Sequence, residues 1–267
     1  MQVNGISLHV EDHGQGTAVL LLHGWPDSSA LWRNQVPHLV ANGFRAIAPD
    51  MRGFGRSDKP AEVATYALSN LVADVIGILD HLKIETAHLV AHDWGAAVAW
   101  LTAALHPDRV RRLVILSVPH PSVPRGLRQR EMGWYQLFFQ FEGIAEAWLQ
   151  HDDWQLFREF SRGNGDSERY LADLSRPGAL TASLNWYRAN LAPRPPGALP
   201  ALPPIQAPTL AVWSTNDHYL DGKRVEASSA FVAGPWRYEE LEGVSHWIPL
   251  EAADRLNRLL LEWLTPS

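Results

Sequence analysis

Through the first half of the chain, short apolar runs alternate with segments whose apolar side chains recur three and four residues apart. Uninterrupted apolar runs suit parallel strands that are buried on both faces of a sheet. They predict strands over residues 18–22, 44–49, 87–91 and 113–117, and the periodic segments between them predict helices over 31–40, 71–82 and 95–105. This alternation predicts an α/β fold with a mostly parallel sheet flanked by helices.

The pattern changes after the fourth predicted strand. A helical segment is interrupted by the polar stretch 161–169 and closes with the proline-rich stretch 192–204, which predicts a stiff return connection. Strands are then expected over 209–214 and 236–241, and a final amphipathic helix over 248–264. We therefore expect one α/β core, residues 1–118 and 205–267, interrupted by a helical lid, residues 119–204.

Composition excludes several classes of function. Acidic residues outnumber basic ones by 29 to 23, so the net charge is −6 and a nucleic-acid partner is not expected. The chain has no cysteine, which excludes a thiol nucleophile, disulfides and cysteine-ligated metals. It shows no leader peptide and no apolar run near the ~20 residues that span a bilayer. A cytoplasmic protein without a membrane partner is expected.

The strongest motif is AHDWGA, residues 91–96, at a predicted strand-to-helix junction. Small residues surround a central Asp93, which is the spacing of a nucleophile elbow. So tight a turn strains its central residue, and the flanking positions must be small. The alternative is that Asp93 only caps the helix that follows.

A nucleophile needs a base, and the base needs an orienting carboxylate. His246 stands between the last predicted strand and the last helix, the position expected of the base. Asp217 follows the strand before it, so the chain order Asp93, Asp217, His246 is that of nucleophile, acid and histidine. Asp221, four residues further on, is the alternative acid.

Two backbone N–H groups are expected to stabilise the negative charge that develops during acyl chemistry. One belongs to Trp94, the residue after the nucleophile. The other is assigned to Trp25, in the turn HGWP that follows the first apolar strand. The alternative is that HGWP is an ordinary turn.

Several motifs of the chain resemble those of a known family. HGWPD (23–27), DMRGFGRS (50–57), AHDWGA (91–96), NWYRAN (185–190) and GVSHWIP (243–249) are similar to motifs of the α/β-hydrolase-fold epoxide hydrolases, of which haloalkane dehalogenases are close cousins. The resemblance implies the α/β-hydrolase fold with an inserted helical lid. Ala91, Ala96 and Ser245 stand where glycine is common in the family, and all three are small.

The chemistry of an aspartate nucleophile agrees with this resemblance. A serine that attacked an sp³ carbon would form an ether, which water does not readily cleave. Asp93 would form an alkyl ester instead, and His246 would activate a water molecule to attack that ester. The sequence therefore predicts hydrolysis with water as the second substrate and with no metal or organic cofactor.

The leaving group separates the two related activities. An epoxide opens to a basic alkoxide, which needs a proton, and a tyrosine hydroxyl can supply one. Tyr135 in GWYQLFFQ and Tyr187 in NWYRAN match, by local motif, the pair of lid tyrosines of epoxide hydrolases. A halide needs only N–H donors, which Trp94 and a lid tryptophan could offer. The leading hypothesis is an epoxide hydrolase for a small apolar epoxide, and the alternatives are a haloalkane dehalogenase and a non-catalytic ligand-binding relative.

Tryptophan is unusually abundant, with 12 residues against 8 Phe and 6 Tyr. Indole rings cover a large apolar area, so the surplus predicts a large aromatic pocket. Trp134 and Trp186 flank the two lid tyrosines and Trp247 follows His246, and these three are assigned to substrate binding.

Overall fold

The computed structural model describes residues 1–161, 166–192 and 201–265. Within these residues, seven strands form one sheet in the order β3-β5-β4-β6-β7-β8-β9, and only β3 runs antiparallel to its neighbour. The described strands, of which β3 to β9 form this sheet, are β1 (Gln2–Val3), β2 (Ile6–Ser7), β3 (Val10–His13), β4 (Thr17–Leu22), β5 (Phe44–Pro49), β6 (Ala87–His92), β7 (Val110–Leu116), β8 (Thr209–Asn216) and β9 (Trp236–Ser245). The predicted fold class, a mostly parallel α/β sheet, is confirmed.

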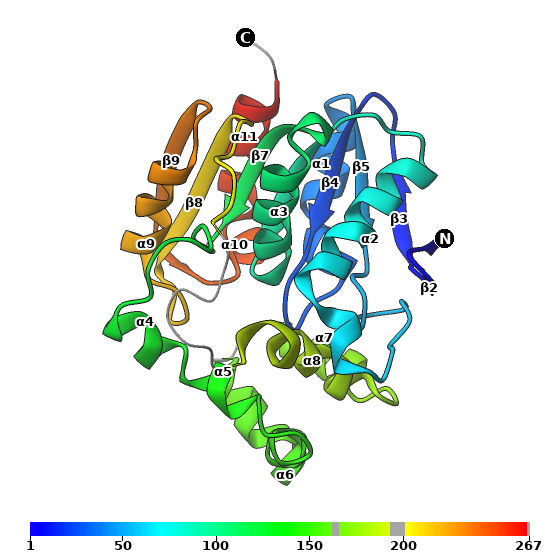
Figure 1. Ribbon diagram of the computed structural model, residues 1–267, viewed down its shortest axis with the longest axis vertical. Helices are drawn as coiled ribbons and strands as arrows, with labels where there is room; N and C mark the ends of the chain where they lie inside the picture. The colour runs from blue at the N-terminus through cyan, green and yellow to red at the C-terminus, as the bar shows by residue number, and fades with distance from the viewer. Residues whose placement is uncertain (162–165, 193–200, 266–267) are drawn as a thin grey trace.

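Helices cover both faces of the sheet (Figure 1). They are α1 (Gln35–Ala41), α2 (Leu68–His81), α3 (Trp94–Leu105), α4 (Leu127–Met132), α5 (Trp134–Phe138), α6 (Ile144–Phe160), α7 (Ser167–Leu174), α8 (Ala179–Leu191), α9 (Gly222–Glu226), α10 (Ile248–Glu251) and α11 (Ala253–Leu264). Short 3₁₀ turns are η1 (Ser29–Trp32), η2 (Val63–Tyr66), η3 (Pro107–Arg109) and η4 (Ala227–Phe231). Among the described residues, no helix is both long and apolar enough to cross a membrane.

The apolar runs form strands because both faces of the sheet are buried. In β4, Leu20 and Leu22 contribute to the core cluster that packs under α2 and α3. Val19 and Leu21 point the other way, into the cluster that includes residues of α1 and α11. Successive side chains of a strand face opposite sides, so a run with no polar position fills both cores at once.

One predicted helix is divided. The expected helix over 248–264 becomes α10 and α11, because Ala252 leaves the helical region with φ −121° and ψ 36°. The Gln35 side chain donates a hydrogen bond to the Pro249 carbonyl over 3.0 Å. That carbonyl would otherwise accept from the N–H four residues on, as in a continuous helix.

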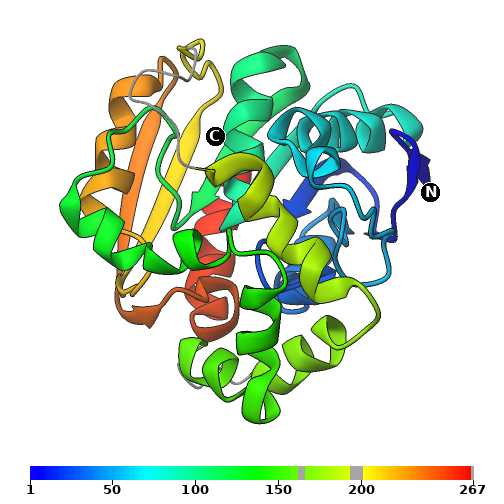
Figure 2. The same cartoon turned by 60° about the horizontal axis from the view of Figure 1, so that its bottom comes forward.

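Helices α4 to α8 are inserted between β7 and β8 and lie across the carboxyl ends of the parallel strands (Figures 1 and 2). We call them the inserted helices. The longest of them, α6, has non-helical backbone from His151 to Trp154 and so changes direction there. The predicted polar interruption and return connection lie partly outside the described residues, at 162–165 and 193–200.

Candidate active site

Asp93 occupies a sharp turn between β6 and α3. Its backbone has φ 50° and ψ −123°, a strained conformation for a residue with a side chain. The turn packs closely against β4. Gly95 leaves no room there for a side chain, because the Cβ of any other residue at this position would lie 2.2 Å from the Leu22 carbonyl oxygen. The Asp93 side chain makes no capping hydrogen bond to α3. The geometry therefore matches a nucleophile elbow and not a simple helix cap.

Both predicted backbone donors act on the Asp93 carboxylate. The Trp25 N–H donates to Oδ1 over 2.8 Å, and the backbone N–H of Trp94 contributes to the lowered pKa of Asp93. Gly24 makes this approach possible, because a Cβ there would lie 2.4 Å from Asp93 Oδ1 and 2.7 Å from the Trp94 nitrogen. The sequence HGWP therefore forms half of an anion-binding site.

His23 fixes the loop that carries the Trp25 N–H. Its Nδ1 hydrogen-bonds the Gly24 carbonyl over 2.9 Å, and its Nε2 accepts from the Met51 N–H over 2.9 Å. Complete burial lowers the pKa of His23, so the ring stays neutral and Nε2 remains an acceptor. A buried neutral imidazole thus links this loop to the end of β5.

Asp217 and His246 directly follow the neighbouring strands β8 and β9, and their side chains are hydrogen-bonded. His246 Nδ1 lies 2.8 Å from Asp217 Oδ2, while Asp217 Oδ1 accepts from the N–H groups of Tyr219 and Leu220 over 2.8 and 3.0 Å. The carboxylate is therefore fixed on both oxygens. The alternative acid, Asp221, instead caps α9 by accepting from its backbone.

The His246 loop is held by hydrogen bonds to its backbone. His92 Nε2 lies 2.9 Å from the His246 carbonyl oxygen, and the Ser214 hydroxyl donates to the Ser245 carbonyl over 2.7 Å. Burial, and then the charge of His246, lowers the pKa of His92 to about 3. His92 is thus a neutral donor that supports the loop.

Asp93, His246 and Asp217 form an alternating row of charges. Burial alone would lower the pKa of His246, but Asp217 and then Asp93 raise it to about 10. Burial acts to raise the pKa of Asp93, and its interactions with His246 bring it below the ordinary value. His246 Nε2 lies 3.7 Å from Asp93 Oδ2. At neutral pH the resting site holds an imidazolium between two carboxylates.

A small cavity opens over this row. Its described lining residues are Trp25, Asp93, Tyr135, Phe160, Tyr187, Tyr219, His246 and Trp247. The strand ends contribute the charged groups, and the inserted helices contribute Tyr135 from α5 and Tyr187 from α8. Aromatic rings thus enclose one carboxylate and one imidazole in a small space.

Tyr135 and Tyr187 line the same cavity as the Asp93 carboxylate. Their ring centroids lie 6.0 Å apart. Burial, and then the negative charge of Asp93, raises the pKa of both phenols well above 10. The Trp94 ring packs edge-on against Tyr187, with ring centroids 5.1 Å apart. Both phenols therefore keep their protons and can donate them within the cavity.

Two of the three tryptophans assigned to substrate binding do not line the cavity. Trp247 does. Trp186 is fully buried behind the wall, where its Nε1 donates to the Arg52 carbonyl over 2.9 Å and its ring packs against Trp94. The Trp134 side chain is turned outward and is 53% exposed. The expected tryptophan pocket is therefore walled mainly by tyrosine and phenylalanine, because consecutive residues of a helix point in different directions.

Two lining residues were not predicted. The Tyr219 hydroxyl donates to the Phe160 carbonyl over 2.5 Å, and the two rings lie 5.1 Å apart. Tyr219 follows Asp217 by two residues, and this proximity could have identified it. Phe160 carries no comparable signal, since its place depends on the change of direction within α6. Among the described residues, no group of three His, Asp or Glu side chains is arranged to hold a metal ion.

Residues 17–253 match the family model of the α/β hydrolase fold. The chain is 32% identical to Epoxide hydrolase A of Mycobacterium tuberculosis, over 99% of this chain and 96% of that protein. It is 34% identical to an epoxide hydrolase of Caballeronia sordidicola, over 98% and 91%. The crystal structure of Epoxide Hydrolase A from Mycobacterium thermoresistibile superposes with a TM-score of 0.84 at 30% identity, covering 99% of this chain and 96% of that one. The chain belongs to the α/β-hydrolase family and, within it, to the group that includes these epoxide hydrolases.

Proposed function

We propose that this protein is an epoxide hydrolase that converts a small apolar epoxide and water into a vicinal diol. One observation carries the proposal: two protonated tyrosines line the same cavity as a carboxylate that accepts a hydrogen bond from the Trp25 N–H. The names of the relatives support the same activity. The chemistry needs no metal and no organic cofactor, and we place the protein in the cytoplasm.

The proposed division of the chain assigns the two halves of the site to two parts. The core, residues 1–118 and 205–267, supplies Asp93, Asp217 and His246. The lid, residues 119–204, supplies Tyr135 and Tyr187. The aromatic wall limits the access of bulk water to the reacting carbon, which strengthens each electrostatic contact there.

In the first step, Asp93 Oδ2 attacks an epoxide carbon. Oδ1 is held by the Trp25 N–H, which leaves Oδ2 to face the cavity and His246. The C–O bond of the epoxide breaks, and the oxygen takes a proton from Tyr135 or Tyr187. The product is a hydroxyalkyl ester on Asp93. The proton of His246 restores the phenol, so the row of charges loses one negative and one positive charge together.

In the second step, neutral His246 accepts a proton from water, and the oxygen of that water attacks Cγ of Asp93. Esterification removes the charge of Asp93, which had helped to raise the pKa of His246. The pKa of the imidazole is therefore lower in the ester than in the resting site, and neutral His246 is available as the base. The N–H groups of Trp25 and Trp94 stabilise the oxyanion on Oδ1. The His246 imidazolium returns the proton to the departing alkoxide, so the diol leaves with Oδ2. Asp93 regains its second oxygen from water, and its new carboxyl group gives its proton to His246.

The leaving group is the point of difference from a haloalkane dehalogenase. Alkoxide needs a proton, and the cavity that holds the nucleophile is also lined by the hydroxyl donors Tyr135 and Tyr187. The decisive experiment supplies an aryl epoxide and a haloalkane of similar size in parallel and follows diol and halide. We expect diol from the epoxide. Halide release without any diol would identify the site as that of a haloalkane dehalogenase. The absence of both products would favour a ligand-binding protein.

Replacing both Tyr135 and Tyr187 with phenylalanine will slow ring opening by about 10²–10⁴-fold, the range of general-acid catalysis. The aromatic walls are retained, so the loss reports the two hydroxyl groups. The measurement is the pre-steady-state rate of ester formation. Tyr219→Phe is the matched control, because that hydroxyl already donates to Phe160. Equal losses in the control and the double variant would contradict the assigned role.

A further inference from the structure

A stripe of large apolar side chains lies on the outside of the inserted helices. Its members are Trp134, Leu137, Phe141, Ile144 and Trp148, with exposed fractions of 53%, 57%, 53%, 54% and 59%. The spacing alternates between three and four residues, which is the spacing of one face of a helix. None of these residues lines the cavity. We call this surface the apolar stripe.

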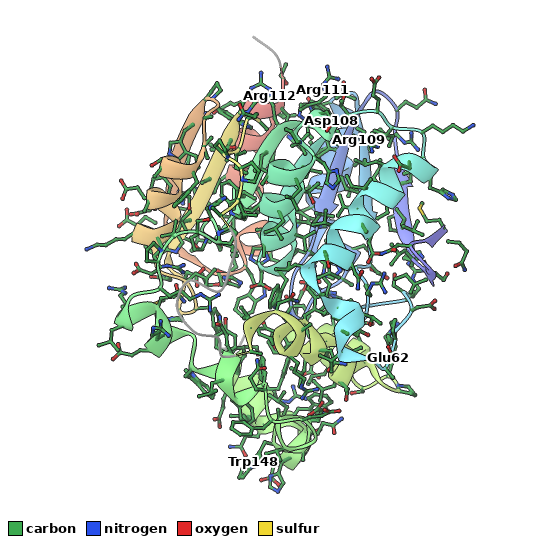
Figure 3. All side chains as sticks on the ribbon, viewed as in Figure 1. Glu62, Asp108, Arg109, Arg111, Arg112 and Trp148 are labelled. Carbon is green, nitrogen blue, oxygen red and sulfur yellow. The ribbon has the colours of Figure 1, made fainter. Side chains whose placement is uncertain are left out.

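Two helices contribute to the stripe, Trp134 and Leu137 from α5 and Ile144 and Trp148 from α6, with Phe141 between them. In the junction the N–H of Gln140 bonds the Leu137 carbonyl and the N–H of Ala145 bonds the Phe141 carbonyl, while the backbone leaves the helical region at Gly143, where φ is 75°. Figure 3 shows the end of the stripe: Trp148 lies at the extremity of the molecule, far from the sheet. The stripe is therefore free to meet a flat partner surface.

The size of the stripe fits a protein partner. A large aromatic side chain presents about 150–250 Å², so five apolar side chains that are a little over half exposed offer on the order of 500 Å². That equals a large patch for a monomer and more than half of the ~800 Å² that each partner buries in a standard interface.

Opposite charges flank the two ends of the stripe. Before it, residues 125–131 carry three arginines and one glutamate, a net charge of +2. After it, at the bend in α6, Asp152 and Asp153 are exposed, with His151 Nδ1 3.0 Å from the Asp152 carboxylate and an Arg158 nitrogen 3.7 Å from that of Asp153. Helices α4 and α6 lie on either side of α5 (Figure 1). If two copies meet in antiparallel fashion about a twofold axis, each basic end faces the acidic end of the other copy.

We propose that the apolar stripe is the interface of a homodimer, in which two copies pack their stripes antiparallel about a twofold axis. A membrane surface suits the stripe less well. The acidic residues at the tip and the overall charge of −6 oppose an anionic bilayer. A self-complementary partner satisfies the apolar residues and both charged ends together. This inference goes beyond the proposed function and does not depend on it.

Analytical ultracentrifugation tests the proposal. From low to high micromolar concentration, the wild-type chain should change from 29.8 kDa to twice that mass. Leu137→Glu and Trp148→Glu each place a charge in the stripe and should raise the dimer dissociation constant at least about tenfold. Leu105→Glu is the matched control, because Leu105 is 50% exposed at the end of α3, away from the inserted helices, and should leave dimerisation unchanged.

The charged ends give a second test. Asp152→Asn combined with Asp153→Asn should weaken the dimer and reduce its sensitivity to salt, and asparagine tolerates the positive φ of both positions. Wild-type protein that remains at 29.8 kDa at every concentration would overturn the proposal. So would a dimer that withstands both glutamate substitutions. A monomer that sediments with anionic vesicles through Trp148 would assign the stripe to membranes instead.

Discussion

Replacing Asp93 with asparagine will abolish epoxide turnover, with a loss on the order of 10⁴-fold or more. Asparagine retains the size of the side chain and can still meet the Trp25 N–H, so the fold and the cavity should persist. What disappears is the negative charge on the atom that attacks the substrate. The measurement is kcat/KM for diol formation, with circular dichroism to verify folding.

Asp221→Asn is the matched control for this loss. Asp221 stands four residues from Asp217 but caps α9, so its replacement should leave kcat/KM nearly unchanged. A single turnover in ¹⁸O-labelled water adds an independent check, because the first diol should carry an unlabelled oxygen from Asp93. Substantial turnover by Asp93→Asn, or label in that first diol, would require a direct attack by water or another nucleophile.

Replacing His246 with glutamine will separate the two steps. Ring opening needs Asp93 and the tyrosines, all of which remain, whereas ester hydrolysis needs the imidazole base. The variant should consume one equivalent of epoxide and then stop, with diol release slowed by about 10²–10⁴-fold. Mass spectrometry should find the whole mass of the epoxide added to the peptide that contains Asp93.

The added mass also identifies the chemistry. An epoxide opens without losing atoms, whereas a haloalkane would add only its alkyl group and release one halide. The double variant Asp93→Asn with His246→Gln should carry no adduct, which excludes labelling elsewhere. An unmodified Asp93 peptide in the single variant, with epoxide still consumed, would contradict the covalent mechanism.

Much of the fold could be predicted because the decisive features are local. Strands β4, β6 and β7 are buried on both faces, and their apolar runs have few other stable arrangements. The break between α10 and α11 could not be predicted. It coincides with a hydrogen bond to the Pro249 carbonyl from Gln35, which stands more than two hundred residues earlier in the chain. The sequence of the helix itself does not indicate such a contact.

The site divides in the same way. The elbow around Asp93 and the turn at Trp25 are fixed by small residues next to them in sequence, and the structure brings both to the same carboxylate. The cavity wall depends on how separate helices pack. Sequence therefore assigned Trp134 and Trp186 to the wall and missed Phe160, although the tyrosines beside those tryptophans do line it.

The origin of the cavity wall has an evolutionary consequence. The charged groups stand at the ends of strands, where a shift of the backbone would disturb two hydrophobic cores. Half of the aromatic residues that line the cavity come instead from α5, α6 and α8, whose side chains can change without touching the sheet. Selection for a new epoxide can therefore act on the inserted helices alone, and descendants of this chain can diversify in substrate while inheriting one reaction.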